Sequence, residues 1–221
     1  MSRPIEVVLE IGSKRTFASA LRWPGWCRPG PGEETALEAL LAYGPRYAGV
    51  LSSDIRSTVP RSLTAFEIVE RIPGDATTDF GAPGTPASAD AERVTARELD
   101  RLTSILRACW RASDAAVGSA TGARLRPGPR GGGRDVAKIA SHVLEADLAY
   151  LMKLGGKAPS GASRDEVRGI FVEALGARAR GELPDVGPRG GARWSARYAV
   201  RRSAWHALDH AWEIEDRLEP A

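Results

Sequence analysis

The chain has 221 residues, of which 43% are hydrophobic, and 31 basic residues against 28 acidic ones give a formal net charge of +3. This length suits one large domain or two small ones, and the composition is ordinary for a soluble globular protein. The weak positive charge, with arginines interleaved among acidic residues, argues against a nucleic-acid partner. The sequence has no apolar run long enough to span a membrane and no signal-peptide core, so a cytoplasmic location without a membrane partner is expected.

Two further features carry little functional information. Cys27 and Cys109 lie far apart in the sequence, so they form neither a metal-binding pair nor a disulfide framework, and two reduced thiols are expected. Residues 124–134 are locally basic but also rich in glycine and proline. We interpret this segment as a solvated loop in preference to a phosphate-binding arm.

The first part of the chain has the pattern of strands and one helix. Apolar and β-branched runs at residues 5–11 and 15–21, separated by a Gly-Ser-Lys turn, predict a β-hairpin. Residues 22–32 contain three prolines and three glycines, which predicts irregular structure. Residues 33–51 are rich in helix formers and begin with two acidic residues, and residues 66–72 predict another strand.

The rest of the chain changes to a helical pattern after a segment that resembles a linker. Residues 73–90 contain three prolines and three glycines and are interpreted as that linker. Asp135 is a candidate N-cap, and Ser163 opens a Ser-Arg-Asp-Glu capping box. Hydrophobic residues at three- and four-residue spacing predict helices at about 92–117, 136–154, 164–180 and 194–218. Four helices with one apolar stripe each predict a four-helix bundle.

The three histidines of the chain fall on two of these helices. His206 and His210 are four residues apart, so they project from one helix face with Cβ atoms about 5–6 Å apart. His142 lies in the middle of the second predicted helix. Metal sites in bundles are built from side chains of facing helices, and three imidazoles with an open position are typical of a catalytic-type metal site. The spacing therefore predicts that the three histidines converge on one metal ion.

This arrangement resembles the DinB/YfiT-like superfamily over about residues 92–217. The resemblance rests on "RDVAKIASHVLEAD", which contains His142, and on "RRSAWHALDHAWEIEDR", which contains His206 and His210. It implies a metal-binding four-helix bundle, and members include thiol-dependent S-transferases and mycothiol-dependent maleylpyruvate isomerases. Because those isomerases have a glutamate in place of the first paired ligand, His206 favours the DinB-like branch.

The first 80 residues have no counterpart in a plain DinB-like domain. The segment "FASALRWPGWCRPGPGEETALEALLAYGPRYAGV" resembles, more faintly, the HicB-type fold, in which a strand pair, a turn and a helix follow in this order. The expected fold class is therefore α+β, with a small α+β module at residues 1–80 and a DinB-like bundle at residues 90–221.

Several side chains are candidates for supporting the metal ligands. Glu213, Asp209 and Glu145 each lie three residues after a histidine, so each could accept a hydrogen bond from an imidazole. The alternative is that Asp209 and Glu213 are solvated or pair with Arg202 and Arg217 at helical spacing.

Other residues near the histidines leave a choice open. Arg201 and Arg202 precede His206 by about one turn, where one of them could hold a substrate carboxylate. Trp205 and Trp212 share a stripe and are interpreted as packing residues in preference to a ligand stack.

The expected cofactor is one divalent metal ion, with zinc as first choice and nickel or iron also compatible with imidazole ligands. The resemblance implies a metal-dependent thiol S-transferase that uses a small thiol such as mycothiol. A non-enzymatic, metal-stabilised stress-response or interaction module is the alternative. Either function leaves a homodimer open.

Overall fold

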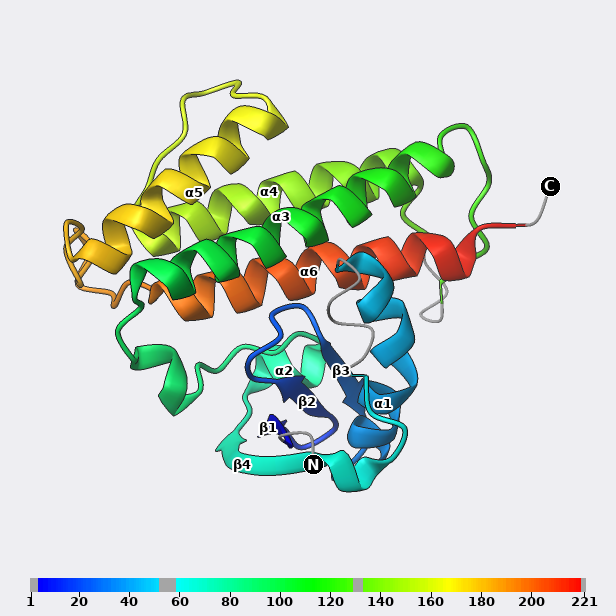
Figure 1. Cartoon of the computed structure of the whole chain (residues 1–221). Coiled ribbons are helices and arrows are strands. Elements are labelled where there is room, and N and C mark those ends of the chain that lie inside the picture. Colours follow the sequence, from blue (N-terminus) through cyan, green and yellow to red (C-terminus); the bar gives the residue numbers. More distant parts are fainter. Residues whose placement is uncertain (1–3, 52–58, 129–132, 220–221) are drawn as a thin grey trace. The chain divides into compact units, whose positions relative to one another are not determined.

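The computed structural model of the chain describes residues 4–51, 59–128 and 133–219. Its elements divide into two compact units, Met1–Glu92 and Arg93–Ala221. The first contains a four-stranded sheet, an 18-residue helix and shorter helical segments, and the second contains four long helices (Figure 1). The predicted α+β class, with an N-terminal sheet module followed by a helical part, is confirmed.

The sheet has the order β3-β2-β1-β4. Its strands are β1 (Ile5–Ile11), β2 (Thr16–Ala20), β3 (Cys27–Gly30) and β4 (Phe66–Pro73). The predicted hairpin is present, because β1 and β2 pair antiparallel. β4 runs parallel to β1, which requires a crossover, and helix α1 (Glu33–Val50) lies between β3 and β4 in the chain.

The prediction of irregular structure for residues 22–32 is wrong in part, because Cys27–Gly30 forms strand β3. β3 pairs antiparallel with β2 and has that single neighbour, so it is an edge strand. Pro29 has no N–H to donate, but an edge strand tolerates proline because only one side of the strand needs hydrogen bonds.

Helix α1 packs on β2 and β3 and encloses the core of the first unit. The Trp26 ring stacks on the Tyr47 ring of α1, with centroids 5.5 Å apart. The Trp26 indole N–H donates to the Leu40 carbonyl at 2.7 Å, and the Tyr47 hydroxyl donates to the Pro24 carbonyl at 2.9 Å. These aromatic residues therefore bury large apolar areas while their polar atoms stay hydrogen-bonded.

The interpretation of residues 73–90 as a linker is also wrong. The segment contains helix α2 (Ala76–Phe80) and the 3-10 turn η3 (Ser88–Ala91), and the first unit extends to Glu92. Proline and glycine mark turns in this segment, but turns can be packed as tightly as regular elements when their backbone groups find partners.

Glu10 supplies those partners. Its carboxylate lies on β1 and is 3% exposed. It accepts hydrogen bonds from the Thr78 hydroxyl at 2.5 Å, the Gly84 N–H at 2.8 Å and the Thr85 N–H at 3.1 Å. One strand carboxylate therefore fixes a stretch of chain that lies about 70 residues later in the sequence.

The second unit contains the four predicted helices. They are α3 (Ala96–Ser119), α4 (Val136–Leu154), α5 (Arg164–Arg180) and α6 (Ala196–Arg217). The N-cap prediction for Asp135 is confirmed, since its side chain accepts from the Lys138 N–H at 2.8 Å, and the capping box at Ser163 and Glu166 is present. α3 begins four residues later than predicted, because Thr95 provides its N-cap.

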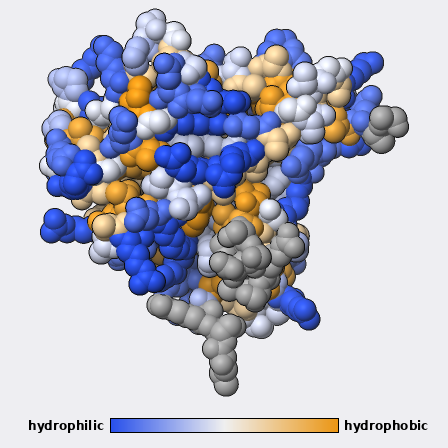
Figure 2. Space-filling view, turned by 45° about the horizontal axis from the view of Figure 1, so that its top comes forward, coloured by the Kyte–Doolittle hydropathy of each residue, from blue (hydrophilic) through white to orange (hydrophobic). Residues whose placement is uncertain are grey.

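Helix α6 packs alongside α3 and α4, and α5 packs on α4 (Figure 1). Within the described ranges, every helix falls short of the combined length and hydrophobicity that a membrane crossing requires. On the face drawn in Figure 2, hydrophilic residues are interspersed with smaller hydrophobic areas.

Candidate metal centre

Helices α4 and α6 carry the three histidines. One turn away from them, Ile139 of α4 packs with Ala211 and Ile214 of α6 in one apolar cluster. The small side chain of Ala211 allows the helix backbones to approach, and the apolar contact fixes how α4 lies against α6. Because His142 follows Ile139 by three residues, it faces the same helix.

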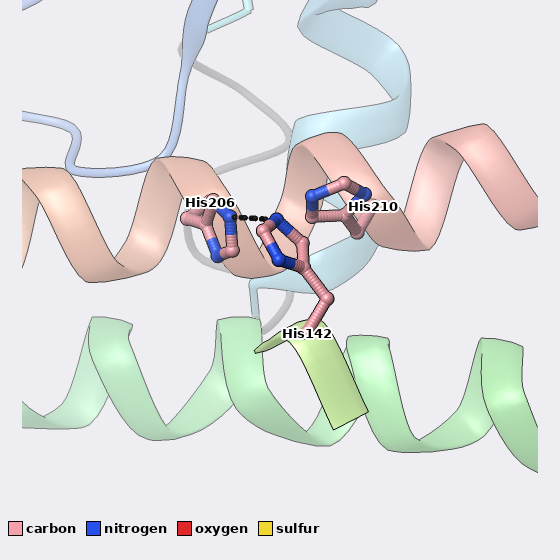
Figure 3. Close-up of side chains that lie close together, drawn as sticks. All are labelled: His142, His206 and His210. Atoms are coloured by element: carbon pink, nitrogen blue, oxygen red, sulfur yellow. Dashed lines mark hydrogen bonds between the residues drawn. The ribbon is translucent and has the colours of Figure 1, made fainter. Parts of the chain in front are cut away.

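The imidazole rings of His142, His206 and His210 form a nearly equilateral triangle. Ring centroids are 4.9 Å apart for His142 and His206, 4.9 Å for His142 and His210, and 4.6 Å for His206 and His210. In Figure 3, His142 reaches from α4 toward the pair on α6, and its ring lies between the other two. One ring nitrogen of each histidine lies within 4.8 Å of the others.

These separations fit a metal ion with a small adjustment. The Nε2 atoms of His142 and His206 are 3.2 Å apart. Two nitrogens that bind one tetrahedral ion at 2.0–2.1 Å lie about 3.3 Å from each other. A pair at the 4.8 Å upper bound would have to close by roughly 1 Å or more, which rotation of an imidazole ring can supply.

His210 is oriented by a carboxylate and an arginine. Its Nδ1 lies 2.8 Å from Glu213 Oε2, and Glu213 Oε1 accepts from Arg217 at 2.5 Å. The sequence left open whether Glu213 contacts an imidazole or pairs with Arg217, and the structure contains both contacts. With Nδ1–H donating to Glu213, Nε2 of His210 carries the lone pair that a metal ion needs.

Arg217 is itself tied to the chain between α3 and α4. Its Nε donates to the Arg126 carbonyl at 2.8 Å, and its Nη2 donates to the Arg134 carbonyl at 3.0 Å. Arg217 is buried, so these bonds and the Glu213 contact hold its guanidinium on three sides. The orientation of His210 therefore depends on a loop that lies about 80 residues earlier in the sequence.

The electrostatic surroundings keep two of the imidazoles neutral. Burial lowers the pKa of His206 well below the usual value, and electrostatic interactions with His210 and Arg202 act in the same direction. Burial also lowers the pKa of His142, again assisted by His210. Hydrogen bonding from His210 lowers the pKa of Glu213 against the opposing effect of burial. Neutral imidazoles beside an ionised carboxylate are the protonation states that metal binding requires.

Around His206, the neighbouring side chains of the cluster are aromatic and cationic. The Tyr150 ring meets the His206 ring edge-on with centroids 5.8 Å apart. The Arg202 guanidinium carbon lies 5.3 Å from the Tyr150 centroid and 4.6 Å from the Trp205 centroid. His206 Nδ1 and Arg202 Nη1 are buried without a hydrogen-bond partner in the part of the chain that the structure describes.

The other two residues that were predicted to support the metal ligands, Glu145 and Asp209, lie on α4 and α6. Glu145 is exposed, and its carboxylate raises the pKa of His142 through its charge. Asp209 is partly buried on α6 between the two histidines, and its role stays a prediction. Trp205 and Trp212 are 4% and 3% exposed, as residues of the packed interior are.

Sequence reasoning missed a buried polar group near the site. Asp147 of α4 is 1% exposed and accepts from the Ser203 hydroxyl of α6 at 2.8 Å. Its other oxygen is 3.7 Å from Arg168 Nε, and burial raises the pKa of Asp147 to about 6. Asp147 lies five residues after His142 on the same helix, and an acidic residue at that spacing carries no signal that distinguishes a buried carboxylate from a solvated one.

Comparisons with known proteins found no family model, no curated protein and no solved structure that matches the chain. The fold and the site therefore define the class of protein by themselves: an α+β chain whose helical unit has a three-histidine cluster that could hold a metal ion.

Proposed function

We propose that the helical unit is a DinB-like module that binds one divalent metal ion through His142, His206 and His210. The observation that carries the proposal is the convergence of one nitrogen from each histidine, all within 4.8 Å of one another. Zinc is the first choice, because three neutral imidazoles with an open position suit it, and nickel or iron are compatible. The order of elements, with one histidine on α4 and the pair on α6, supports the DinB-like assignment.

The activity we propose is transfer of a small thiol, such as mycothiol, to an electrophile. When bound, the metal ion would stabilise the thiolate form of a coordinated thiol near neutral pH. The thiolate sulfur attacks the electrophilic carbon, a carbon–sulfur bond forms, the leaving group departs with its electron pair, and the thiol proton passes to solvent. Glu213 holds the His210 ring in the orientation that this requires, and burial of His206 keeps its ring neutral.

A second candidate is a metal-stabilised interaction module without turnover. The observation that favours it is burial: His206 is 7% exposed and His210 is 9% exposed. A metal held by deeply buried ligands is typical of a structural site. The partial exposure of His142 favours the enzyme, because it leaves one side of the cluster closer to solvent.

Elemental analysis of the purified chain tests metal binding. We expect about one divalent ion per chain in the wild type. His206→Ala and His210→Ala should each weaken metal affinity by more than about 100-fold, since loss of a mere supporting partner costs about 10–100-fold. Glu215→Ala, an exposed position on the same helix, is the matched control and should bind metal like the wild type. Equal metal content in all four proteins would overturn the site.

A thiol panel distinguishes the two candidates. Metal-loaded protein is mixed with mycothiol and other small thiols, and chlorodinitrobenzene serves as the electrophile whose chloride leaves. The enzyme proposal requires a rate above that of the His210→Ala control. A metal-bound protein with no such rate for any thiol favours the interaction module.

A further inference from the structure

Two hydrogen-bond donors lie one turn apart on α6 beside the histidine cluster. His206 is 7% exposed, and its Nδ1 has no hydrogen-bond partner among the described residues; the same holds for the buried Nη1 of Arg202. When Nε2 of His206 binds the proposed metal ion beside His142, its Nδ1 carries the proton and is a donor. A buried donor left without a partner costs about 1–3 kcal/mol, so a pair of them in one place calls for a function.

Tyr150 and Trp205 hold both donors. The Arg202 guanidinium lies over both aromatic rings, at 5.3 Å and 4.6 Å from their centroids. The His206 ring contacts the same two rings, with centroids 5.8 Å and 6.0 Å away. Stacking uses the faces of the guanidinium and leaves the N–H groups at its edge to meet an anion. Two aromatic rings therefore pre-orient a cation beside the cluster.

Arg202 differs from Arg197 and Arg217 of the helical unit in that no carboxylate pairs with its guanidinium among the described residues. Arg197 pairs with Glu98 at 2.8 Å, and Arg217 pairs with Glu213 at 2.5 Å. Arg202 has no carboxylate partner within the described part of the chain, and its neighbours include the rings of Tyr150 and Trp205. An unpaired guanidinium in such surroundings attracts an anion more strongly than a solvated one does.

We propose that Arg202 and the Nδ1–H of His206 form an anion subsite beside the metal centre, which selects small thiols that carry a carboxylate. This inference rests on the proposed function. Four residues, about 6 Å along the helix axis, separate the two residues on α6. A short mercaptocarboxylate can therefore place its sulfur at the histidine cluster while its carboxylate accepts hydrogen bonds from Arg202.

Binding to the cobalt-loaded protein tests the selectivity. The thiolate-to-cobalt absorption band is titrated with 3-mercaptopropionate and with its uncharged analogue 2-mercaptoethanol. We expect the carboxylate thiol to bind at least about tenfold more tightly to the wild type, the value of one charge-assisted hydrogen bond. Arg202→Gln should abolish this preference without changing the affinity for 2-mercaptoethanol. Arg202→Lys should retain part of it, and the adjacent Arg201→Gln should retain all of it.

A second probe separates the subsite from the thiol function. Propionate, which has no sulfur, is added to the wild type while the Arg202 Nε–H and His206 Nδ1 resonances are followed by NMR. A shift of the His206 Nδ1 resonance that disappears in Arg202→Gln supports the subsite even if no thiol gives the cobalt band, and that outcome would remove only the thiol function. Equal affinity of the wild type for both thiols, or no shift with propionate, overturns the anion subsite.

Discussion

Two buried acidic side chains, one in each unit, differ in how fully hydrogen bonds satisfy their oxygens. In the sheet unit, the carboxylate of Glu10 is 3% exposed and accepts three hydrogen bonds. In the helical unit, Asp147 is 1% exposed, yet one of its oxygens has no hydrogen bond, and the same is true of His206 Nδ1 among the described residues. A native interior satisfies most buried polar groups, so the unsatisfied ones need a separate explanation.

A buried polar group whose hydrogen bonds are all made within the fold has a structural role, whereas one that lacks partners can still bind a ligand, an ion or a proton. The Glu10 carboxylate accepts hydrogen bonds from backbone and hydroxyl groups of its own unit, and its role is to hold the segment after β4 in place. Three unsatisfied atoms, Asp147 Oδ2, Arg202 Nη1 and His206 Nδ1, lie on α4 and α6, the two helices that carry the histidines. Polar groups with unused capacity are where a ligand, an ion or a proton has the largest effect.

Removal of the metal should act on one unit alone. A chelator should lower the stability of α4 and α6 by about 4 kcal/mol when metal is present at about 1,000 times its dissociation constant. Hydrogen exchange of the full chain measures this, and the amides of β1 and β2 should keep their protection. In His210→Ala the effect of the chelator should fall to about 1.4 kcal/mol or less, because the metal is then at no more than about 10 times its dissociation constant. Equal loss of protection in both units would contradict the comparison.

Truncation of Glu10, whose two carboxylate oxygens both accept hydrogen bonds, should have the next largest effect on stability. Glu10→Ala leaves the Thr78 hydroxyl and two backbone N–H groups without their acceptor, and we expect a loss of about 3 kcal/mol in the free energy of unfolding. Hydrogen exchange of the β1 and β4 amides reports it, with the exposed Glu67→Ala as control. A change below about 1 kcal/mol would mean that Glu10 does not hold the segment after β4 in place.

The unsatisfied Asp147 should make stability depend on pH. Its pKa is raised to about 6 in the fold, against about 3.9 in the unfolded chain, so the unfolded state loses this proton first as pH rises. The contribution of Asp147 to stability is therefore greatest at low pH. It should fall by about 2 kcal/mol between pH 4 and pH 7 and then stay constant.

The measurement is urea unfolding of the wild type and Asp147→Asn across this pH range. The difference between the two unfolding free energies should change with pH in the stated direction, because asparagine does not titrate. A difference that is flat with pH, or that changes in the opposite direction, would show that Arg168 compensates the buried carboxylate fully.

The smallest effect on metal binding is expected for Glu213, which does not bind the metal itself but orients the ligand His210. Glu213→Gln keeps an acceptor for His210 Nδ1–H but removes the charge, so metal affinity should fall by about tenfold, the lower end of the range for such partners. Competition with a chelator of known affinity measures it. Asp216→Asn, which removes an exposed carboxylate from the same helix, is the control. Unchanged affinity in Glu213→Gln would assign Glu213 to Arg217 alone.

Much of the fold could be predicted from local patterns. The hairpin of β1 and β2, helix α1, strand β4 and the four long helices follow from hydrophobic period, and Asp135 and Ser163 mark helix starts through their own side chains. Strand β3 and the ordered segment after Pro73 could not be predicted, since both look like loops locally. β3 depends on its pairing with β2, and the later segment depends on Glu10, which are contacts between distant residues.

The sequence by itself determined which histidines share a helix face, because the spacing of His206 and His210 is a property of any α-helix. Only the tertiary structure decided that His142 meets them, since the packing of α4 on α6 sets that distance. The same packing decided that Arg202 stacks on Tyr150 and that Arg217 reaches the carbonyls of Arg126 and Arg134. Helical period repeats within a helix, whereas the facing of two helices is set by the apolar surfaces they bury together.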